Sequence, residues 1–251
     1  MTFGFCHLSI VPLRENPSDT SEMTSQLLFG DVFEVIEKVS PNWIKIRSAF
    51  DSYEGYMDPK QQISIDSVDY ISAQTPKKVN RRMLEIETKM GKLFIPPACS
   101  FGDLKEENDF VLSSNLELDD FEIASRTEII EMALSFLNAP YLWGGKTPFG
   151  VDCSGFTQSV FKMAGKKLPR DASQQVNEGE ALSFLEEALP GDLAFFDNEE
   201  GNIIHVGVIL GNNEIIHASG KVRIDKIDHV GIYNADTKSY SHKLRITKTL
   251  L

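Results

Sequence analysis

The sequence predicts an α+β protein whose carboxyl-terminal half places helices before strands. Short apolar runs between turn residues fill the first part of the 251-residue chain, and helical periodicity begins at Ser125. After Pro190 and Gly191 the pattern returns to short apolar runs, which predict an antiparallel sheet. Helices followed by such a sheet are the order of an α+β domain.

Residues 1–66 are predicted to form a small β-barrel. They contain the runs L-L-F-G-D-V-F-E-V-I-E, P-N-W-I-K-I-R and Y-E-G-Y-M, with partly alternating apolar residues that indicate a meander of strands. These runs resemble a bacterial SH3-like domain, and the resemblance implies a barrel here.

Residues 67–122 carry a weaker pattern. Turn residues recur at strand-length intervals, at Gly91, Pro96, Pro97, Gly102 and Asp103. They predict further β-structure, and a second SH3-like barrel is one arrangement of it. A strand over residues 92–95 must end before Pro96, because proline interrupts a ladder of hydrogen bonds.

Residues 123–251 are predicted to form the largest domain. Ser125, or alternatively Thr127, caps a first helix that ends at Asn138. A second helix follows from Cys153 and ends before Gly165, and a third lies around residues 173–177. The strand runs after them are D-L-A-F-F, I-I-H-V-G-V-I-L, E-I-I-H-A-S and V-R-I-D.

Composition argues against nucleic acid and anionic membranes as partners. The formal net charge is -12 and the pI is about 4.9, whereas both partners need a basic face. We find no secretory signal pattern and no apolar stretch near the roughly 18 residues of a membrane span. The three cysteines are far apart, which fits a reducing compartment. We therefore expect a cytoplasmic location, and we predict no metal site or cofactor.

Cys153 is predicted to lie where a loop becomes a helix. The stretch before it, P-Y-L-W-G-G-K-T-P-F-G-V-D, is rich in loop-forming residues, and apolar residues at helical spacing follow it. The free N–H groups of a first helical turn favour a thiolate, since this position can lower a cysteine pKa to about 3.5–7.5. The other interpretation is a small buried hydrophobe. The flanking loop residues favour a nucleophile.

The chain resembles the NlpC-type cysteine peptidases, which cleave bacterial cell-wall peptides. The signature D-C-S-G-F, with P-Y-L-W-G-G before it, is followed in order by four more runs: L-P-R-D-A-S-Q-Q, P-G-D-L-A-F-F, H-V-G-V-I-L-G and I-I-H-A-S-G. The resemblance implies a papain-like catalytic domain. In it Cys153 is the nucleophile, His205 is the general base, and His217 orients the base.

Whether His205 and His217 share a face of the sheet depends on the turn between them, near residues 211–213. With two loop residues, Gly211 pairs with Glu214 and the two histidines fall on opposite faces. With three, they become diagonal neighbours on one face, about 7–8 Å apart. Asparagine and glycine suit the left-handed position of a three-residue loop. We therefore predict an odd-length loop; an even one needs a compensating bulge.

The family resemblance also suggests side chains around the nucleophile. Asp152 is either structural or substrate-binding, and Ser154 is a candidate donor to the peptide. Backbone N–H groups at the head of the Cys153 helix are candidate oxyanion donors, with Tyr141 as a helper. Trp143 is a candidate wall of the cleft.

Five further residues have less specific patterns. Arg170 and Asp171 either bind charged ends of the substrate or form an ordinary surface ion pair. The remaining histidines match no motif, and we expect them to be ordinary packing or surface residues: His7, His229 and His242.

The family hydrolyses γ-D-glutamyl bonds to a diamino acid. Members with amino-terminal SH3-like domains resemble murein-recycling enzymes, which act on free peptides that begin with L-alanine. An acidic side chain of the barrel would pair with the free ammonium group of such a small peptide, and a charge-assisted hydrogen bond contributes about 1.5–3 kcal/mol. By motif, the candidates are Glu22 and Tyr53, with Tyr56 as an alternate. The competing interpretation of Glu22 is an ordinary exposed carboxylate.

Two other functions stay open. One is a wall-peptide-binding module with a vestigial catalytic domain, and the other is a cysteine amidase or acyltransferase on the same core. The intact set of Cys153, His205 and His217 weighs against the first.

Overall fold

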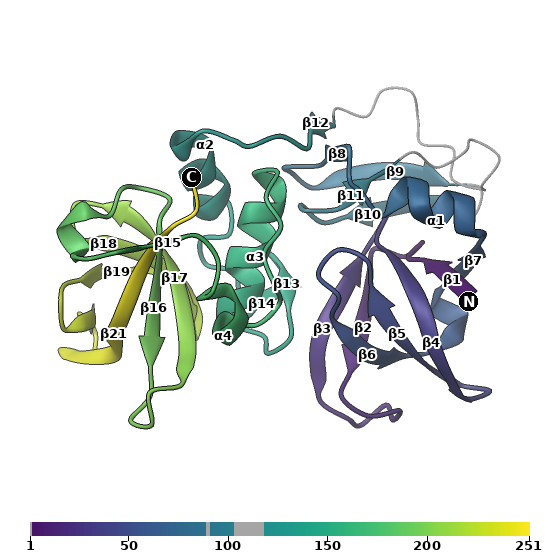
Figure 1. Ribbon diagram of the computed structural model, residues 1–251, viewed down its shortest axis with the longest axis horizontal. Coiled ribbons are helices and arrows are strands. Elements are labelled where there is room, and N and C mark those ends of the chain that lie inside the picture. Colours follow the sequence, from purple (N-terminus) through teal and green to yellow (C-terminus); the bar gives the residue numbers. More distant parts are fainter. Residues whose placement is uncertain (1, 89–90, 103–117) are drawn as a thin grey trace. The chain divides into compact units, whose positions relative to one another are not determined.

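The structure is a computed structural model that describes residues 2–88, 91–102 and 118–251. The chain divides into two compact units, one of residues 1–122 with 165–167 and the other of residues 123–164 with 168–251 (Figure 1). The predicted α+β class is confirmed by the mixture of helices and strands. No helix within the described ranges is both long and apolar enough to cross a bilayer.

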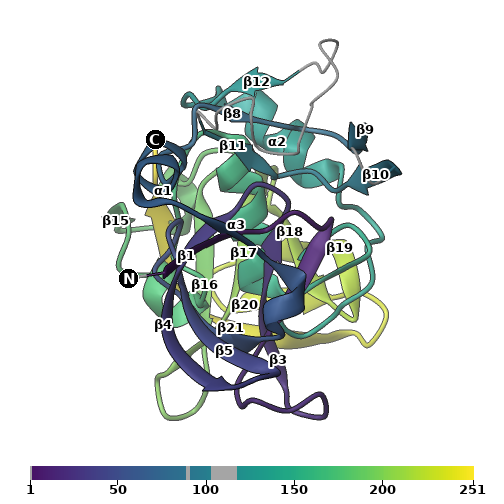
Figure 2. The ribbon, with the colours of Figure 1, turned by 90° about the vertical axis from the view of Figure 1, so that its right-hand side faces the viewer.

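The amino-terminal unit is built on seven antiparallel strands that curl around an apolar core (Figure 2). The strands lie in the order β3-β2-β6-β5-β4-β1-β7. Their inward residues alternate along each strand, as the pleat requires, and include Val11, Leu13, Phe33 and Ile46. The elements are β1 (Thr2–Phe5), β2 (Ile10–Arg14), β3 (Met23–Leu28), β4 (Val32–Ser40), β5 (Trp43–Ser48), β6 (Glu54–Met57), η1 (Pro59–Gln61) and β7 (Ile63–Ile65).

Residues 67–122 differ from the predicted β-structure, because they open with a helix, α1 (Ser67–Ala73). Asp66 caps it by accepting hydrogen bonds from two backbone N–H groups of its first turn. In their described part these residues form two small sheets rather than a second barrel, and β10 ends at Ile95, as the prolines require. The predicted turn residue Asp103 lies outside the described residues. The strands are β8 (Lys78–Val79), β9 (Leu84–Thr88), β10 (Gly91–Ile95), β11 (Ser100–Phe101) and β12 (Asp119–Asp120).

The helices of the second unit begin close to where the sequence predicts them. Helix α2 (Arg126–Leu134) is capped by Ser125, whose side chain and that of Glu128 form a reciprocal capping box. It ends earlier than predicted, because the residues after Leu134 form hydrogen bonds between residues three apart, as in a 3₁₀ turn. Asn138, which follows them, has the positive φ of the left-handed region. The other elements ahead of the sheet are β13 (Lys146–Thr147), β14 (Gly150–Val151), α3 (Cys153–Met163) and α4 (Ala172–Gln175).

The sheet of the second unit closes on itself. Its order is β15-β21-β16-β17-β18-β19-β20, and β20 also pairs with β21, so that six strands form a ring. A core cluster that includes Phe196, Ile209, Ile215 and Ile232 fills it, and α3 contacts β17 and β18. The elements are β15 (Glu180–Leu182), η2 (Leu185–Glu187), β16 (Leu193–Asp197), β17 (Ile203–Gly211), β18 (Glu214–Ser219), β19 (Lys221–Ile227), β20 (Gly231–Asn234) and β21 (Ser239–Thr249).

The predicted odd-length loop between β17 and β18 is wrong. Gly211 pairs with Glu214 across two loop residues, both asparagines with positive φ, which is the geometry of a primed turn. A β-bulge at Leu210 then moves the register by one residue, so that Gly207 lies opposite His217. His205, two residues before Gly207, therefore faces the same side as His217. The bulge achieves what we had assigned to a longer loop.

Candidate active site

Cys153 is the first residue of α3, which confirms the predicted junction of loop and helix. Asp152 caps the helix: its Oδ1 accepts from the N–H of Gly155 at 2.7 Å, and its Oδ2 accepts from the N–H of Gly144 at 2.8 Å. The carboxylate thus joins the glycine loop to the helix. In the same first turn, the backbone N–H of Ser154 hydrogen-bonds to the Cys153 sulfur.

Arg170 is buried and holds the Asp152 cap, so it is not part of a surface ion pair. Its side chain is only 2% exposed, and its Nη1 donates to Oδ1 of Asp152 at 3.0 Å and to Oγ of Ser154 at 2.9 Å. Its Nη2 donates to the second carboxylate oxygen at 2.5 Å. Asp152 and Ser154 are themselves buried. Their side chains are engaged inside the protein, which supports the structural alternative for Asp152 and leaves the Ser154 hydroxyl hydrogen-bonded to Arg170.

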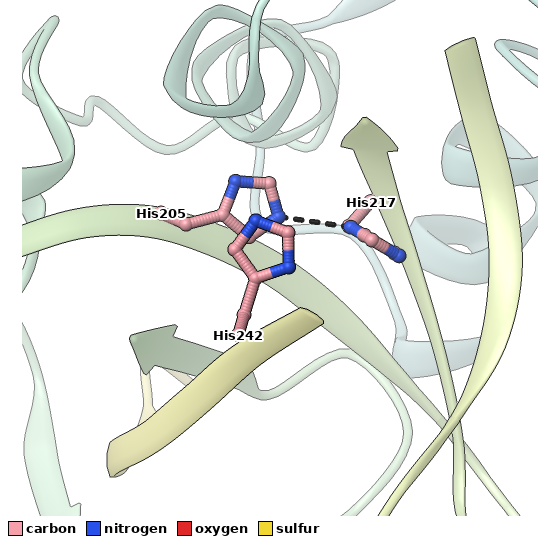
Figure 3. Close-up of side chains that lie close together, drawn as sticks. All are labelled: His205, His217 and His242. Atoms are coloured by element: carbon pink, nitrogen blue, oxygen red, sulfur yellow. Dashed lines mark hydrogen bonds between the residues drawn. The ribbon is translucent and has the colours of Figure 1, made fainter. Parts of the chain in front are cut away.

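His205 and His217 form a hydrogen-bonded pair inside the ring of strands (Figure 3). Nε2 of His205 lies 2.9 Å from Nδ1 of His217, and Nε2 of His217 lies 3.1 Å from Oδ2 of Asp225. Nη2 of Arg223 donates to Oδ1 of Asp225 at 2.8 Å, and Nε of Arg223 lies 2.7 Å from Oδ2 in an ion pair. The chain of contacts therefore runs from His205 through His217 to a carboxylate that an arginine holds in place.

This chain determines which nitrogen of His205 can accept a proton. Burial acts to raise the pKa of Asp225, but hydrogen bonds from His217 and Arg223 outweigh it and hold that pKa below its usual value. The ionised carboxylate only accepts, so His217 donates from Nε2, and in the tautomer that carries its hydrogen there Nδ1 is an acceptor. His205 must then donate from Nε2. Its Nδ1, which is turned away from His217 in Figure 3, carries the free lone pair.

Cys153 lies against the strand that carries His205. The backbone N–H of Val206, the residue after His205, hydrogen-bonds to the Cys153 sulfur. A thiol, an imidazole with one free nitrogen, and a residue that orients the imidazole are what acyl transfer through a cysteine requires.

The thiol is not the thiolate that its helix position led us to expect. Burial, reinforced by the charge of Asp152, raises the pKa of Cys153 to about 11, and the hydrogen bond from Val206 offsets this only in part. Burial also lowers the pKa of His205 well below 6.5, and His242 and His217 add to this effect. Both groups are therefore neutral near pH 7, and the proton must move from sulfur to nitrogen as the sulfur attacks.

We expect the alkylation rate of Cys153 by iodoacetamide to rise about tenfold per pH unit from pH 7 to pH 9. The reason is that the thiolate fraction rises with pH until the thiol pKa is reached. Peptide mass spectrometry measures labelling at Cys153, and Cys153→Ala is the control because Cys6 and Cys99 are fully buried. A rate that is constant from pH 5 to pH 8 would instead indicate a thiolate paired with an imidazolium.

Two residues of this cluster carried no recognisable signal in the sequence. Asp225 belongs to the run V-R-I-D, which predicts only a strand; on β19 it lies next to Ile215 of β18, two residues before His217. His242 lies on β21, and its ring stacks on that of His205 with centroids 4.0 Å apart. Both were brought into the site by strand pairings that local pattern does not predict.

The three histidines His205, His217 and His242 hold ring nitrogens within 4.8 Å of one another, a donor set that metals can use. Their rings, however, are arranged for other contacts. A metal ion binds in the plane of an imidazole, whereas the rings of His205 and His242 are stacked face to face at an interplanar angle of 21°. We therefore interpret the cluster as a hydrogen-bonded pair with a stacked third ring.

The remaining predicted residues of the second unit lie at its surface or beside the thiol. Burial raises the pKa of Tyr141 to about 12, and the thiolate that Cys153 forms in that alkaline range adds to the effect together with Asp152, which indicates a position near the sulfur. Trp143 is 58% exposed on the glycine loop. Asp171 is half-buried and precedes α4, without a side-chain capping bond.

The candidates of the first unit lie around strands β3 and β6. Glu22 is exposed immediately before β3, and Tyr53 is half-buried against the core of the curled sheet. Tyr56 is on β6, where the Lys45 ammonium lies 5.9 Å from the centre of its ring.

Comparison with known proteins identifies a domain in each unit. Residues 138–240 match the model of the NlpC/P60 family. The chain contains an NlpC/P60 domain. Residues 13–61 match the model described as bacterial dipeptidyl-peptidase Sh3 domain, so the curled sheet is an SH3-like barrel that precedes the NlpC/P60 domain.

Curated relatives align with about a third of the chain or with most of it. The γ-D-glutamyl-L-lysine dipeptidyl-peptidase of Bacillus subtilis is 45% identical over 93 residues, which cover 36% of this chain and 31% of that protein. The protein of the same name from Bacillus cereus is 26% identical over 80% of this chain and 68% of its own length. Dipeptidyl-peptidase 6 of Lysinibacillus sphaericus is 25% identical over 86% of this chain and 88% of its own length.

Solved structures share the fold. The crystal structure of an NlpC/P60 family protein from Bacillus cereus aligns over 99% of both chains with a TM-score of 0.81 and 20% identity. An NlpC/P60 endopeptidase from Photobacterium damselae subsp. piscicida aligns over 99% of this chain and 73% of its own, with a TM-score of 0.74 and 15% identity. At these identities the likeness concerns the fold alone.

Proposed function

We propose that this protein is a cysteine peptidase that hydrolyses the bond between γ-D-glutamate and a diamino acid in free murein peptides beginning with L-alanine. The observation that carries the proposal is the hydrogen-bonded chain of His205, His217 and Asp225 beside the Cys153 thiol. The names of the relatives from two Bacillus species, γ-D-glutamyl-L-lysine dipeptidyl-peptidase, support the bond type, and the name of the relative from Lysinibacillus sphaericus supports release of a dipeptide.

The geometry suggests a sequence of proton transfers. The Cys153 sulfur attacks the γ-carbonyl carbon of D-glutamate while Nδ1 of His205 takes the thiol proton. N–H groups at the start of α3, with the Tyr141 hydroxyl, would stabilise the oxyanion. His205 then gives its proton to the leaving amine of the diamino acid, and a thioester remains. His205 next removes a proton from water, whose oxygen attacks the thioester and releases the dipeptide and the thiol.

We further propose that the SH3-like barrel supplies recognition of the free amino terminus, through Glu22 with Tyr53. An exposed carboxylate next to a peptide ammonium contributes a charge-assisted hydrogen bond of about 1.5–3 kcal/mol when water is excluded. This energy corresponds to about tenfold to a hundredfold selection against an acylated amino terminus. Free peptides and three free cysteines both fit a cytoplasmic location, which we include in the proposal.

The test is cleavage of L-Ala-γ-D-Glu-L-Lys and L-Ala-γ-D-Glu-diaminopimelate, each with a free and with an acetylated amino terminus. We expect release of L-Ala-D-Glu from the free forms and about tenfold to a hundredfold lower kcat/KM for the acetylated forms. Glu22→Gln should reduce this preference, and Glu37→Gln, which removes an exposed carboxylate from β4, should not. Liquid chromatography of the released dipeptide measures both rates.

Different results would contradict different parts of the proposal. Equal cleavage of free and acetylated peptides would remove the recognition of the amino terminus but keep the peptidase. Tight binding without cleavage would favour the wall-peptide-binding module. Transfer of the L-Ala-D-Glu group to an added amine in preference to water would favour the acyltransferase.

A further inference from the structure

His242 contacts both members of the histidine pair, although it belongs to none of the sequence motifs. Its ring stacks on His205 with centroids 4.0 Å apart and an interplanar angle of 21°. It meets His217 edge to face, with centroids 5.8 Å apart at 82°. Figure 3 shows the three rings gathered from separate strands, with His242 lying across His205.

The ring of strands explains how His242 reaches this position. His205 is on β17 and His242 is on β21, and β16 runs between them. Residues opposite one another on paired strands face the same side, and His242 lies opposite Ile232, whose side chain is in the core cluster of the ring. His242 therefore points inward, as His217 does. Phe196 of β16 lies near both stacked rings, with centroids 5.7 Å from His205 and 6.0 Å from His242.

The stacking supplies a restraint that the hydrogen bonds leave out. The hydrogen bond from Nε2 of His205 to Nδ1 of His217 fixes the position of one ring atom. The plane of the His205 ring can still rotate about that atom. A flat side chain in contact with one face prevents that swing, and stacked aromatic rings attract each other. The bond at Nε2 and the contact at the ring face together determine where Nδ1 of His205 points.

We propose that His242 is a positioning residue for the general base, and that its flat ring keeps Nδ1 of His205 directed at the proton of the Cys153 thiol. The inference rests on the proposed thiol chemistry. His242 touches neither the thiol nor the substrate in this role; it acts through His205.

The environment of His242 is compatible with a cation forming on His205. Burial and the nearby His217 lower the pKa of His242 to about 4, against an opposing effect of Asp225 on β19. Oγ of Ser241 hydrogen-bonds to Nδ1 of His242 at 2.9 Å. Phe196 on β16 carries no charge. At pH 7 His242 is therefore neutral while the thiol proton passes to His205, and a neutral aromatic face accepts a neighbouring cation.

The test compares variants at position 242 that keep or remove a flat ring. We expect His242→Phe to retain most of kcat, whereas His242→Leu should lose about tenfold to a hundredfold in kcat with KM little changed, the loss typical when a supporting partner of a functional histidine is removed. His242→Gln is a second variant without a ring, in case the leucine variant folds poorly. His229→Leu, which changes an exposed histidine of the same domain, is the matched control and should leave kcat unchanged.

A second readout does not need the peptide substrate. At pH 6, where free thiolate is about tenfold scarcer than at pH 7, alkylation of Cys153 by iodoacetamide proceeds mainly with transfer of the thiol proton to His205. This rate should fall in His242→Leu and His242→Gln but not in His242→Phe. This comparison still tests the positioning role if the protein cleaves none of the murein peptides. Wild-type kcat and alkylation in the leucine and glutamine variants would overturn the proposal. So would an equal loss in the phenylalanine variant, since the ring would then be irrelevant.

Discussion

Cys153→Ala is expected to reduce cleavage of L-Ala-γ-D-Glu-L-Lys by at least about 10⁴-fold, because removal of a nucleophile leaves only binding and oxyanion stabilisation. The fold should persist: the side chain removed is small, and the Asp152 cap with its bonds to Gly144, Gly155 and Arg170 does not involve the sulfur. Initial rates by chromatography and a thermal melt measure the two quantities.

The matched control is Cys6→Ala, which removes another fully buried free thiol, in the core of the SH3-like barrel. It should lower the melting temperature modestly and leave kcat near the wild-type value. Cleavage by Cys153→Ala within tenfold of wild type would contradict the nucleophilic role and, with it, the proposed reaction.

His217→Phe is expected to lower kcat by about 10²-fold to 10⁴-fold, the range seen when the group that orients a catalytic histidine is removed. Phenylalanine keeps a flat ring in a site that is only 1% exposed, but it offers no acceptor to Nε2 of His205. The base is then free to turn and to take the other tautomer. Steady-state kinetics at pH 7 measure the loss.

Asp225→Leu extends this test into a double-mutant cycle. Alone it should lower kcat by about tenfold to a hundredfold, because His217 loses the partner that sets its tautomer. Arg223 keeps a partner, since its Nη2 also donates to Asp236 at 2.9 Å, so the fold should tolerate the change. Combined with His217→Phe, it should cause no further loss. Additive effects would show that Asp225 acts on the reaction by a route that does not pass through His217.

Local sequence signals were sufficient where the feature is local. The start of α3 follows from a glycine-rich loop, a capping aspartate and helical spacing after Cys153, and all of these lie within a few residues. The cap of α2 by Ser125 is local in the same sense. The end of β10 before Pro96 follows from the chemistry of proline itself.

Features that depend on chain pairing escaped the same reasoning. The turn after β17 has the two-residue form that its asparagines favour, and the bulge at Leu210 that restores the register carries no local signal. The burial that raises the pKa of Cys153 is also a property of the packed domain, and it outweighs the helix position that the sequence reveals.

The sequence by itself determined the order of helices and strands in the second unit, the cysteine at the head of a helix, and the two histidines of the motifs, because each depends on residues close together in the chain. Only the tertiary structure decided that Asp225 and His242 join them. In the ring of six strands, side chains from four different strands meet in the interior. Which residues meet there depends on how all the strands pair, and no short stretch of the sequence specifies that pairing.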